Sequence, residues 1–565
     1  MLSEAPFLLK SADEAVALQV LSVETADKSP VDLAEAGPRF AEALGKVWAR
    51  ALESDGLNRL VLAAGLAWRE VAIMRTYAKY LRQAGIAFSQ DYMERVLSSY
   101  PVIARLVIDL FLARLDPAMG EATSDIRKQR LDRLETEIAG ALEGVATLDE
   151  DRILRRFFNT VRCTLRTNYW QTGPDRAPKD WISIKIDSRA IDELPAPRPL
   201  VEIFVYSPRM EGIHLRGGRV ARGGIRWSDR REDFRTEILG LMKTQMVKNA
   251  VIVPVGSKGG FYVKRPPINA QGSGGTREQV QAEGIACYQM LIRGLLDLPN
   301  NYPPDDIVPP ADVVRHDPDD PYLVVAADKG TATFSDIANA LAREYGFWLD
   351  DAFASGGSAG YDHKKMGITA RGAWESVKRH FRELGQDIQT TPFTVAGVGD
   401  MSGDVFGNGM LLSRHIKLVA AFDHRHIFID PAPNPATSWE ERKRLFALPR
   451  SSWMDYDKSL LSAGGGIYDR AAKAVALSAE ARAGLGIGGP AMAPVDLMRS
   501  ILAAPVDLLY FGGIGTYVKA ASESQADAGD RANDPLRING DQLRARVVGE
   551  GANLGFTQRG RVEAA

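Results

Sequence analysis

The sequence predicts an α/β protein that is preceded by a helical region. Three observations lead to this fold class. Apolar residues recur near the helical period through much of residues 1–165. Short β-rich runs punctuated by glycine and proline begin near Trp181 and alternate with helical stretches. After Thr391, the segment FTVAGVG predicts a strand that ends in glycines and leads into a helix.

Four helices are expected in the N-terminal region. The apolar period predicts one helix over residues 60–85, with Gly85 as its C-cap, and another over residues 102–116 that stops at Pro117. A third covers residues 124–145, and Thr147 with Glu150 forms a capping-box signature for a fourth. No catalytic pattern is visible here, so a packing or oligomerisation module is expected.

Composition bounds the class of protein. A length of 565 residues suggests three or four domains at roughly 100–200 residues each. The net charge of -2 provides no global basic field that would draw the chain to nucleic acid or a membrane. The only cysteines, Cys163 and Cys287, lack a Cys or His at metal-ligand spacing. These features, with an N-terminus that lacks a secretory signal, predict a cytoplasmic protein without a disulfide framework.

The strand–turn–helix from residue 391 carries part of a dinucleotide-binding pattern. Gly397 and Gly399 have its first two spacings, while Ser402 occupies the third position and Gly403 follows. Such glycines let the backbone approach a pyrophosphate at a helix N-terminus. Asp423 ends the next expected strand, where a carboxylate would accept hydrogen bonds from the adenine-ribose hydroxyls and disfavour NADP. A turn with a purely structural role is the alternative.

A second pattern combines cations with glycine turns in RGGRVARGGIRWSDRREDFRTEILGLMKTQMVKNAVIVPVGSKGGFYVKRP. Arg222, Lys248 and Lys258 are its candidate binding and catalytic cations, because cations on rigid elements suit a substrate with two carboxylates. Glycines bracket Lys258 on both sides, so the backbone there comes close to another group. Neighbouring cations are expected to lower the pKa of Lys258. A solvated surface charge is the alternative for each lysine.

This order of motifs, GGIRW, EILGLMKTQMVKNA and GSKGG, resembles the glutamate dehydrogenase superfamily. The segments GGIRWSDRREDFRTEILGLMK and DKGTATFSDIAN are similar to those of its large bacterial NAD-specific class. The resemblance extends from about residue 40 to the end of the chain. The resemblance implies that Lys258 is the catalytic lysine and Asp328 the catalytic aspartate. Read alone, Asp328 ends an apolar strand and could equally be an N-cap.

The resemblance also implies binding roles. Lys248 matches the lysine that holds the substrate α-carboxylate, and Gly223 and Gly224 match glycines that approach the substrate. Arg222 stands where the family has a lysine for the side-chain carboxylate, and arginine can bind a carboxylate with two hydrogen bonds.

For the cofactor, the resemblance implies NAD and no metal. Thr369 is similar to the threonine that touches the nicotinamide amide, and Asn553 to an asparagine at the nicotinamide end of the site.

These patterns together give the predicted organisation and function. Residues 1–165 are expected to form the helical region, residues 166–370 an α/β substrate-binding and catalytic domain, and residues 371–565 a Rossmann-type NAD-binding domain that is either truncated at the C-terminus or a divergent short form. The expected reaction is reversible, NAD-dependent deamination of glutamate to 2-oxoglutarate and ammonia, by a homo-oligomer that binds no nucleic acid or membrane. An amino-acid dehydrogenase for an apolar substrate, or a non-catalytic nucleotide-binding fragment or regulatory subunit, is the alternative.

Overall fold

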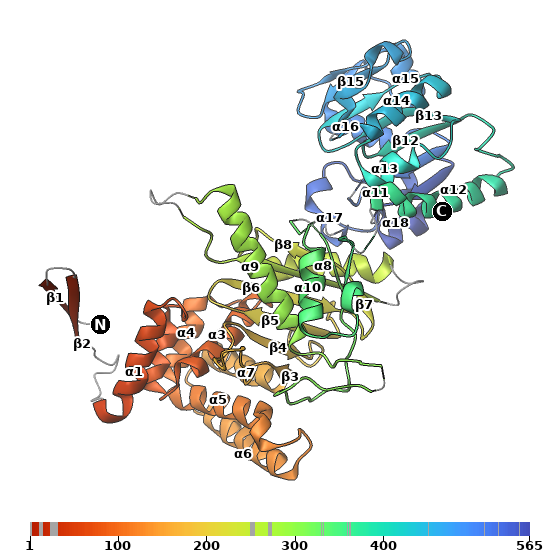
Figure 1. Ribbon diagram of the computed structural model, residues 1–565. Helices are drawn as coiled ribbons and strands as arrows, with labels where there is room; N and C mark the ends of the chain where they lie inside the picture. The colour runs from red at the N-terminus through yellow and green to blue at the C-terminus, as the bar shows by residue number, and fades with distance from the viewer. Residues whose placement is uncertain are drawn as a thin grey trace. The chain divides into compact units, whose positions relative to one another are not determined.

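The computed structural model describes most of the chain and confirms the α/β class (Figure 1). The described residues are 3–10, 15–22, 32–248, 255–268, 274–304, 306–328, 330–331, 333–358, 360, 363–449, 451–513, 515–528, 530–552 and 554–565. They fall into two compact units, Met1–Ala359 and Gly360–Ala565.

The first unit opens with a β-hairpin, which the helical prediction missed. Strands β1 (Ser3–Lys10) and β2 (Ala15–Ser22) pair antiparallel from Ser3 opposite Ser22 to Lys10 opposite Ala15. Seven helices follow: α1 (Leu33–Trp48), α2 (Leu60–Ala63), α3 (Trp68–Gln83), α4 (Gln90–Ser99), α5 (Pro101–Leu115), α6 (Asp125–Leu142) and α7 (Leu148–Arg162).

Local capping explains where these helices begin and end. The single helix predicted over residues 60–85 is wrong, because Gly65 has a φ of +63° and separates α2 from α3. Glu70 then caps α3 by accepting from the backbone N–H of Ala67 at 2.9 Å. At the other helices the predicted signals hold: the Thr147 hydroxyl accepts from Glu150 N–H at 3.3 Å at the start of α7.

A seven-stranded sheet forms the centre of the first unit. Its strands are β3 (Thr164–Thr167), β4 (Ile182–Ile186), β5 (Val201–Tyr206), β6 (Met210–Arg216), β7 (Ala221–Arg222), β8 (Ile225–Trp227) and β9 (Val255–Val263). The order is β3-β4-β5-β6-β9-β7, with β8 also paired to β9. Strands β3 to β6 and β9 are antiparallel neighbours, whereas β7 and β8 run parallel to β9. Helix α8 (Phe234–Lys248) connects β8 to β9.

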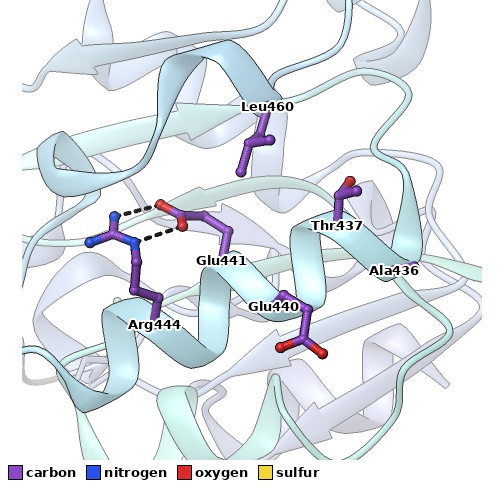
Figure 2. A pocket seen from close by; sticks show the side chains of 6 residues that line it. All are labelled: Ala436, Thr437, Glu440, Glu441, Arg444 and Leu460. Carbon is purple, nitrogen blue, oxygen red and sulfur yellow. Dashed lines mark hydrogen bonds and ion pairs between the residues drawn. The ribbon is translucent and has the colours of Figure 1, made fainter.

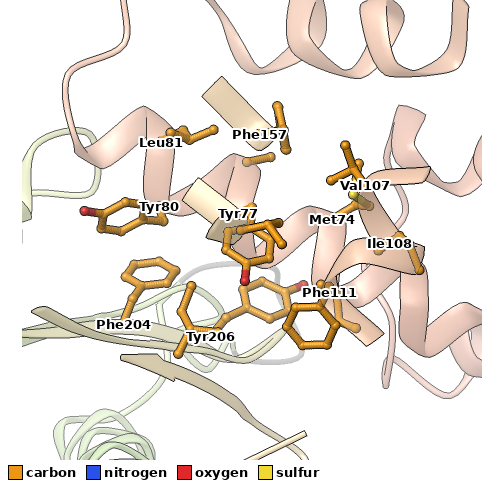
Figure 3. Packing of buried hydrophobic residues seen from close by; sticks show 14 of the residues in the cluster. Met74, Tyr77, Tyr80, Leu81, Val107, Ile108, Phe111, Phe157, Phe204 and Tyr206 are labelled. Carbon is orange, nitrogen blue, oxygen red and sulfur yellow. The ribbon is translucent and has the colours of Figure 1, made fainter. Parts of the chain in front are cut away.

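The N-terminal helices and this sheet share one hydrophobic core, seen in Figure 3. Tyr80 on α3 packs edge-on against Phe204 on β5, with ring centroids 5.7 Å apart. Phe111 on α5 and Phe157 on α7 are fully buried in the same cluster. The predicted division at residue 165 therefore stays a prediction, although it coincides with the change from helix to sheet.

A second core lies around the remaining elements of the first unit. These are α9 (Arg277–Leu296), β10 (Val325–Ala326), α10 (Ser335–Glu344) and β11 (Ala354–Ser355). Strands β10 and β11 pair parallel, and buried residues of α9 and α10 pack with Ile225 of β8. This packing holds the segment after β10 close to β8.

In the described part of the chain, no single helix has the length and apolar character needed to cross a membrane. Helices α4 and α5, which are bent by 98° from one another, meet that test of length and composition only as a pair.

The second unit is built on a six-stranded sheet with helices around it. Its strands are β12 (Phe393–Val398), β13 (Ile416–Phe422), β14 (His426–Ile429), β15 (Gly466–Asp469), β18 (Leu508–Phe511) and β21 (Val547–Glu550). Its helices are α11 (His363–Met366), α12 (Ile368–Glu383), α13 (Asp404–Gly409), α14 (Pro435–Ala447), α15 (Ala479–Leu485), α16 (Pro494–Leu502), α17 (Gln525–Ala528) and α18 (Gln558–Ala564). Two small pairs complete it: β16 (Val475–Ala476) with β17 (Ala491–Met492), and β19 (Val518–Lys519) with β20 (Ile538–Asn539).

The topology of this sheet is of the predicted Rossmann type. The order is β15-β14-β13-β12-β18-β21, and β13, β12, β18 and β21 are parallel. The chain moves from β12 to β13 on one side and returns to β18 on the other. Ligands of such sheets bind at the carboxyl ends of the strands beside this switch point, where Gly397 and Gly399 lie.

Candidate active site

Strand pairing brings Lys258 and Asp328 together in the first unit. Ile225 of β8 pairs parallel with Gly259 of β9 and bridges in parallel to Ala327. Lys258 and Asp328 each stand next to one of these partners of Ile225. The Thr331 hydroxyl fastens the segment by donating to the carbonyl of Ile225 at 2.7 Å.

The two predicted catalytic groups form a short ion pair. Lys258 Nζ lies 2.6 Å from Asp328 Oδ2, and the two side chains are 6% and 20% exposed. Arg226 Nε donates to the same oxygen at 2.9 Å. Among the described residues, no group donates to Asp328 Oδ1, so that oxygen remains available as a proton acceptor.

Burial and charge set the pKa values of this pair in opposite senses. Burial is the largest influence on Lys258 and lowers its pKa, while Asp328 acts in the other direction. Burial alone would raise the pKa of Asp328, but Lys258 and Arg226 together bring it below its ordinary value. The direction predicted for Lys258 is thus found, but with a different cause: burial, with Arg226 as the contributing cation.

Arg226 is the site residue that sequence reasoning missed. It lies inside the GGIRW motif, where the sequence pattern gives no signal for a contact with Asp328. Its partner Asp328 is 102 residues away, so only the pairing of β8 with the segment after β10 reveals the contact.

The glycines before β8 are explained by backbone packing. A Cβ on Gly223 would lie 1.6 Å from the carbonyl oxygen of Ser257, and one on Gly224 would lie 2.9 Å from that of Ala327. Both positions therefore require glycine for β8 to sit between β9 and the segment that carries Asp328. Their predicted approach to substrate stays a prediction.

Arg222 lies beside the same strand. It pairs with Gly256 of β9, so position 222 shares the face of Lys258. Its side chain is exposed and forms no ion pair with another described residue. Lys248 is the last residue of α8, one helical turn after Gln245, whose backbone packs against Gly256. The side chain of Lys248 is outside the described part of the structure.

The glycine turn of the second unit follows β12. Gly399 has a φ of +139°, and a Cβ there would lie 2.7 Å from Phe406. A Cβ on Gly397 would lie 2.6 Å from the same ring. The carbonyl of Gly399 accepts a hydrogen bond from the buried indole of Trp453 at 3.1 Å. The two glycines therefore let α13 approach the end of β12 closely.

The amides expected to meet a pyrophosphate are occupied by a side chain. Asp400 Oδ1 accepts from the backbone N–H of Ser402 at 2.7 Å and of Gly403 at 3.0 Å. The Ser402 hydroxyl donates to the same oxygen at 2.5 Å. A dinucleotide at this turn would have to share or displace these hydrogen bonds.

Asp423 stands where the ribose carboxylate was predicted. It follows β13 and is 7% exposed. Its Oδ1 accepts from the backbone N–H of Arg425 at 2.7 Å and of His426 at 2.6 Å, whereas its Oδ2 is buried without a hydrogen-bond partner. Asp423, Asp400 and His424 each offer a ligand atom within 4.8 Å of one another. An unpartnered buried carboxylate oxygen suits ribose hydroxyls, which can donate to it.

Thr369, the remaining described cofactor candidate, belongs to the second unit. It is exposed near the start of α12. The preceding α11 is held to α13 because the Asn408 side chain donates to the carbonyl of Lys364 at 2.8 Å. Asn553 lies outside the described residues.

A surface depression in the second unit contains none of these residues (Figure 2). It lies between α14 and the segment around Leu460 and is lined by Ala436, Thr437, Glu440, Glu441, Arg444 and Leu460. Glu441 and Arg444, three positions apart on α14, form an ion pair at its edge at 2.6 Å. It is therefore not the site that the motifs define.

Two family models match the chain. One, described as bacterial NAD-glutamate dehydrogenase, catalytic domain, matches residues 137–565. The other, described as glutamate dehydrogenase, helical motif 3, matches residues 52–117.

Curated relatives extend the similarity over almost the whole chain. It is 61% identical over 534 residues to the NAD-specific glutamate dehydrogenase of Mycobacterium tuberculosis, covering 93% of this chain and 33% of that protein. It is 53% identical over 565 residues to the enzyme of the same name from Halomonas elongata, covering 100% of this chain and 34% of that protein. The chain thus spans about a third of the length of these relatives. The solved glutamate dehydrogenase of Plasmodium falciparum aligns at 13% identity and a TM-score of 0.35, covering 90% of this chain and 80% of that one.

Proposed function

Because the chain belongs to the family of bacterial NAD-glutamate dehydrogenase catalytic domains, we propose that it catalyses the reversible NAD-dependent oxidation of L-glutamate to 2-oxoglutarate and ammonia. The observation that carries this proposal is the buried pair of Lys258 and Asp328, 2.6 Å apart, with one carboxylate oxygen open. The relatives that are 61% and 53% identical to this chain are named NAD-specific glutamate dehydrogenase.

The substrate carboxylates are held by cations around β9. Arg222 has an exposed guanidinium without an ion-pair partner among the described residues, which leaves it able to bind the side-chain carboxylate of glutamate. Lys248, at the end of α8, binds the α-carboxylate. Two cationic anchors favour glutamate over an apolar amino acid, which needs only one.

Lys258 and Asp328 carry out the proton chemistry. Asp328 Oδ1 accepts a proton from the substrate ammonium, so that the neutral amine can release a hydride from Cα and become an iminium. A water molecule then adds to the iminium carbon. Lys258 Nζ stabilises the oxygen that develops there, and Asp328 moves the protons that allow ammonia to leave. The lowered pKa of Lys258 suits an amine that shares protons at this position.

The second unit carries the residues that fit NAD. The buried, unpartnered Oδ2 of Asp423 fits the hydroxyls of the adenine ribose, and a carboxylate there disfavours a 2′-phosphate. Gly397, Gly399, Ser402 and Gly403 form the turn for the pyrophosphate, and Thr369 and Asn553 contact the nicotinamide end. When bound, NAD supplies the acceptor for the hydride that leaves Cα.

Assembly and location remain part of the proposal. We expect a homo-oligomer in the cytoplasm, acting on small molecules without nucleic acid or a membrane. Both cysteines are free and buried.

Turnover of the purified protein tests the proposed function. With NAD, L-glutamate should produce NADH and ammonia in equal amounts, while leucine, valine and phenylalanine should react far more slowly. NADP should be a poor substitute. A preference for an apolar amino acid, or NAD binding without any turnover of glutamate, would contradict the proposal.

A further inference from the structure

Ser228, Glu237 and Arg226 form a chain of hydrogen bonds that ends at Asp328. The Ser228 hydroxyl donates to Glu237 Oε2 at 2.6 Å. Arg226 Nη1 donates to Glu237 Oε1 at 2.9 Å, and its Nε donates to Asp328 Oδ2 at 2.9 Å. The guanidinium therefore spans two carboxylates, one on α8 and one after β10.

This arrangement is built into the fold. Arg226 pairs with Gly260 in the parallel register of β8 and β9, so its side chain lies on the same face of the sheet as Lys258. A Cβ on Gly260 would lie 2.3 Å from Ile238, which follows Glu237 on α8. The helix can thus lie close enough for Glu237 to reach the guanidinium, and both partners are largely buried, at 20% and 13% exposure.

We propose that Arg226, backed by Glu237 and Ser228, is a positioning residue that fixes the Asp328 carboxylate beside Lys258 and leaves its Oδ1 open to the substrate. Arginine suits this role because its planar fork binds two acceptors in fixed directions and keeps its charge at working pH. Lysine at this position could supply the charge but not the geometry. The inference rests on the proposed function only where it assigns the proton transfer to Asp328.

Charge balance at the site makes the role measurable. The charged groups that face the pair are Arg226 from β8, Lys258 from β9 and Glu237 from α8, around Asp328 itself. Arg226 lowers the pKa of both Asp328 and Lys258, whereas Glu237 raises that of Lys258. Removing the guanidinium should therefore raise both pKa values, and removing the Glu237 charge should lower that of Lys258.

Kinetics as a function of pH are the first test. In Arg226→Gln, both limbs of the kcat/KM profile should move to higher pH and kcat should fall at least about tenfold. In Glu237→Gln, the alkaline limb should move to lower pH. The double variant, which restores the net charge, should bring the limbs back toward the wild type. Arg226→Lys should keep the limbs in place while lowering kcat, because the charge remains and the fork is lost.

A matched control separates positioning from a general effect of removing an arginine. Arg209 forms a two-bond pair with Glu283 at 3.0 and 2.6 Å, away from the site. Arg209→Gln should leave the pH limbs unchanged. If Arg226→Gln also left them unchanged while the wild type turned over glutamate, the inference would be wrong and the proposed function would stand.

A second readout does not depend on turnover. Trace acetylation of lysines with acetic anhydride, followed by peptide mass spectrometry, gives the pH at which Lys258 becomes reactive. This midpoint should rise in Arg226→Gln and fall in Glu237→Gln, relative to Lys243 as an internal reference. Equal midpoints in the wild type and both variants would overturn the inference even if the protein showed no activity toward glutamate.

Discussion

At Asp328, two cations share one carboxylate oxygen while the other has no donor among the described residues. In the proposed mechanism this asymmetry gives the two oxygens different roles: the contacts of Oδ2 fix the side chain, and Oδ1 accepts and returns protons. Lys258 contacts Oδ2, and burial is the largest cause of its lowered pKa.

Replacing the carboxylate tests this division. Asp328→Asn keeps the shape, and its amide oxygen can take the place of Oδ2 beside Lys258 and Arg226, but the amide cannot accept a proton at working pH. We expect kcat to fall about 10²–10⁴-fold, the usual range for loss of a general base, with little change in NAD affinity. Steady-state kinetics and calorimetric NAD titration measure the two quantities. A kcat within threefold of the wild type would contradict the role of Asp328.

Arg222 offers a test of substrate choice. Arg222→Ala should raise the KM for glutamate at least about tenfold, because a charge-assisted hydrogen bond is lost. It should alter the KM for NAD little and reduce the preference for glutamate over leucine. An unchanged glutamate KM would show that another residue holds the side-chain carboxylate.

Sequence reasoning could find Lys258 but not Arg226. Three nearby glycines mark Lys258 as a place where backbones approach closely, and this signal is local. The partners of Arg226 lie 11 and 102 residues away, and the second distance is bridged only by tertiary pairing. The hydrogen bonds from the backbone N–H groups of Ser402 and Gly403 to Asp400 could not be predicted either, because they depend on the orientation of the Asp400 side chain.

At the scale of elements, the junction of β8 with β9 depends on glycine for steric reasons. Gly223 has a backbone carbonyl where a Cβ would stand, and Gly224 has another slightly farther away. The resemblance implies that these glycines approach the substrate, and only the structure shows that backbone carbonyls are their neighbours.

A single methyl group tests this packing. Gly223→Ala should destabilise the first unit by about 3 kcal/mol, the upper part of the range for overpacking, because backbone rather than a flexible side chain must move. A Cβ on Gly240 of α8 would meet no described atom within 4 Å apart from the backbone of its own helix, so Gly240→Ala is the matched control. Chemical denaturation measures both, and equal stabilities would rule out the steric account.

The turn after β13 carries the test of cofactor choice. Asp423→Asn retains Oδ1, which accepts from two backbone N–H groups, and replaces the unpartnered Oδ2 with a donor. NAD binding should weaken about tenfold, and discrimination against NADP should diminish. Nicotinamide mononucleotide, which lacks the adenine ribose, should bind as before. Unaltered NAD affinity would remove Asp423 from the cofactor site.

At the scale of the whole molecule, the catalytic segment is tied to the sheet by buried charges. Asp320 accepts from Lys185 at 2.6 Å and from Arg216 at 3.0 Å, and all three side chains are nearly inaccessible. Asp320 lies eight residues before Asp328. This cluster therefore anchors the segment that leads to Asp328, the proposed catalytic carboxylate.

Asp320→Asn should destabilise the first unit by about 3 kcal/mol, because buried Arg216 loses its carboxylate partner and Lys185 keeps only Asp317. Burial would raise the pKa of Asp320, but Arg216 and Lys185 bring it far below its ordinary value. A carboxyl with a depressed pKa contributes its full stability above about pH 4 and loses it as the pH falls further. The difference between variant and wild type, from urea unfolding, should shrink on acidification below pH 4. A constant difference would contradict this account.

The helical region shows what sequence patterns leave open at this scale. Periodicity located α3, α5, α6 and α7, but it joined α2 to α3 across Gly65 and missed α1 and α4. It could not show that Tyr80 and Phe204 share a core with the sheet, because such contacts join residues more than a hundred positions apart.

The most direct test of the central claim is the Lys258→Ala variant, assayed for both NADH production from glutamate and calorimetric NAD binding. If Lys258 is catalytic as proposed, turnover should disappear while the NAD dissociation constant stays within about threefold of the wild-type value. Near-normal glutamate oxidation by this variant would contradict it.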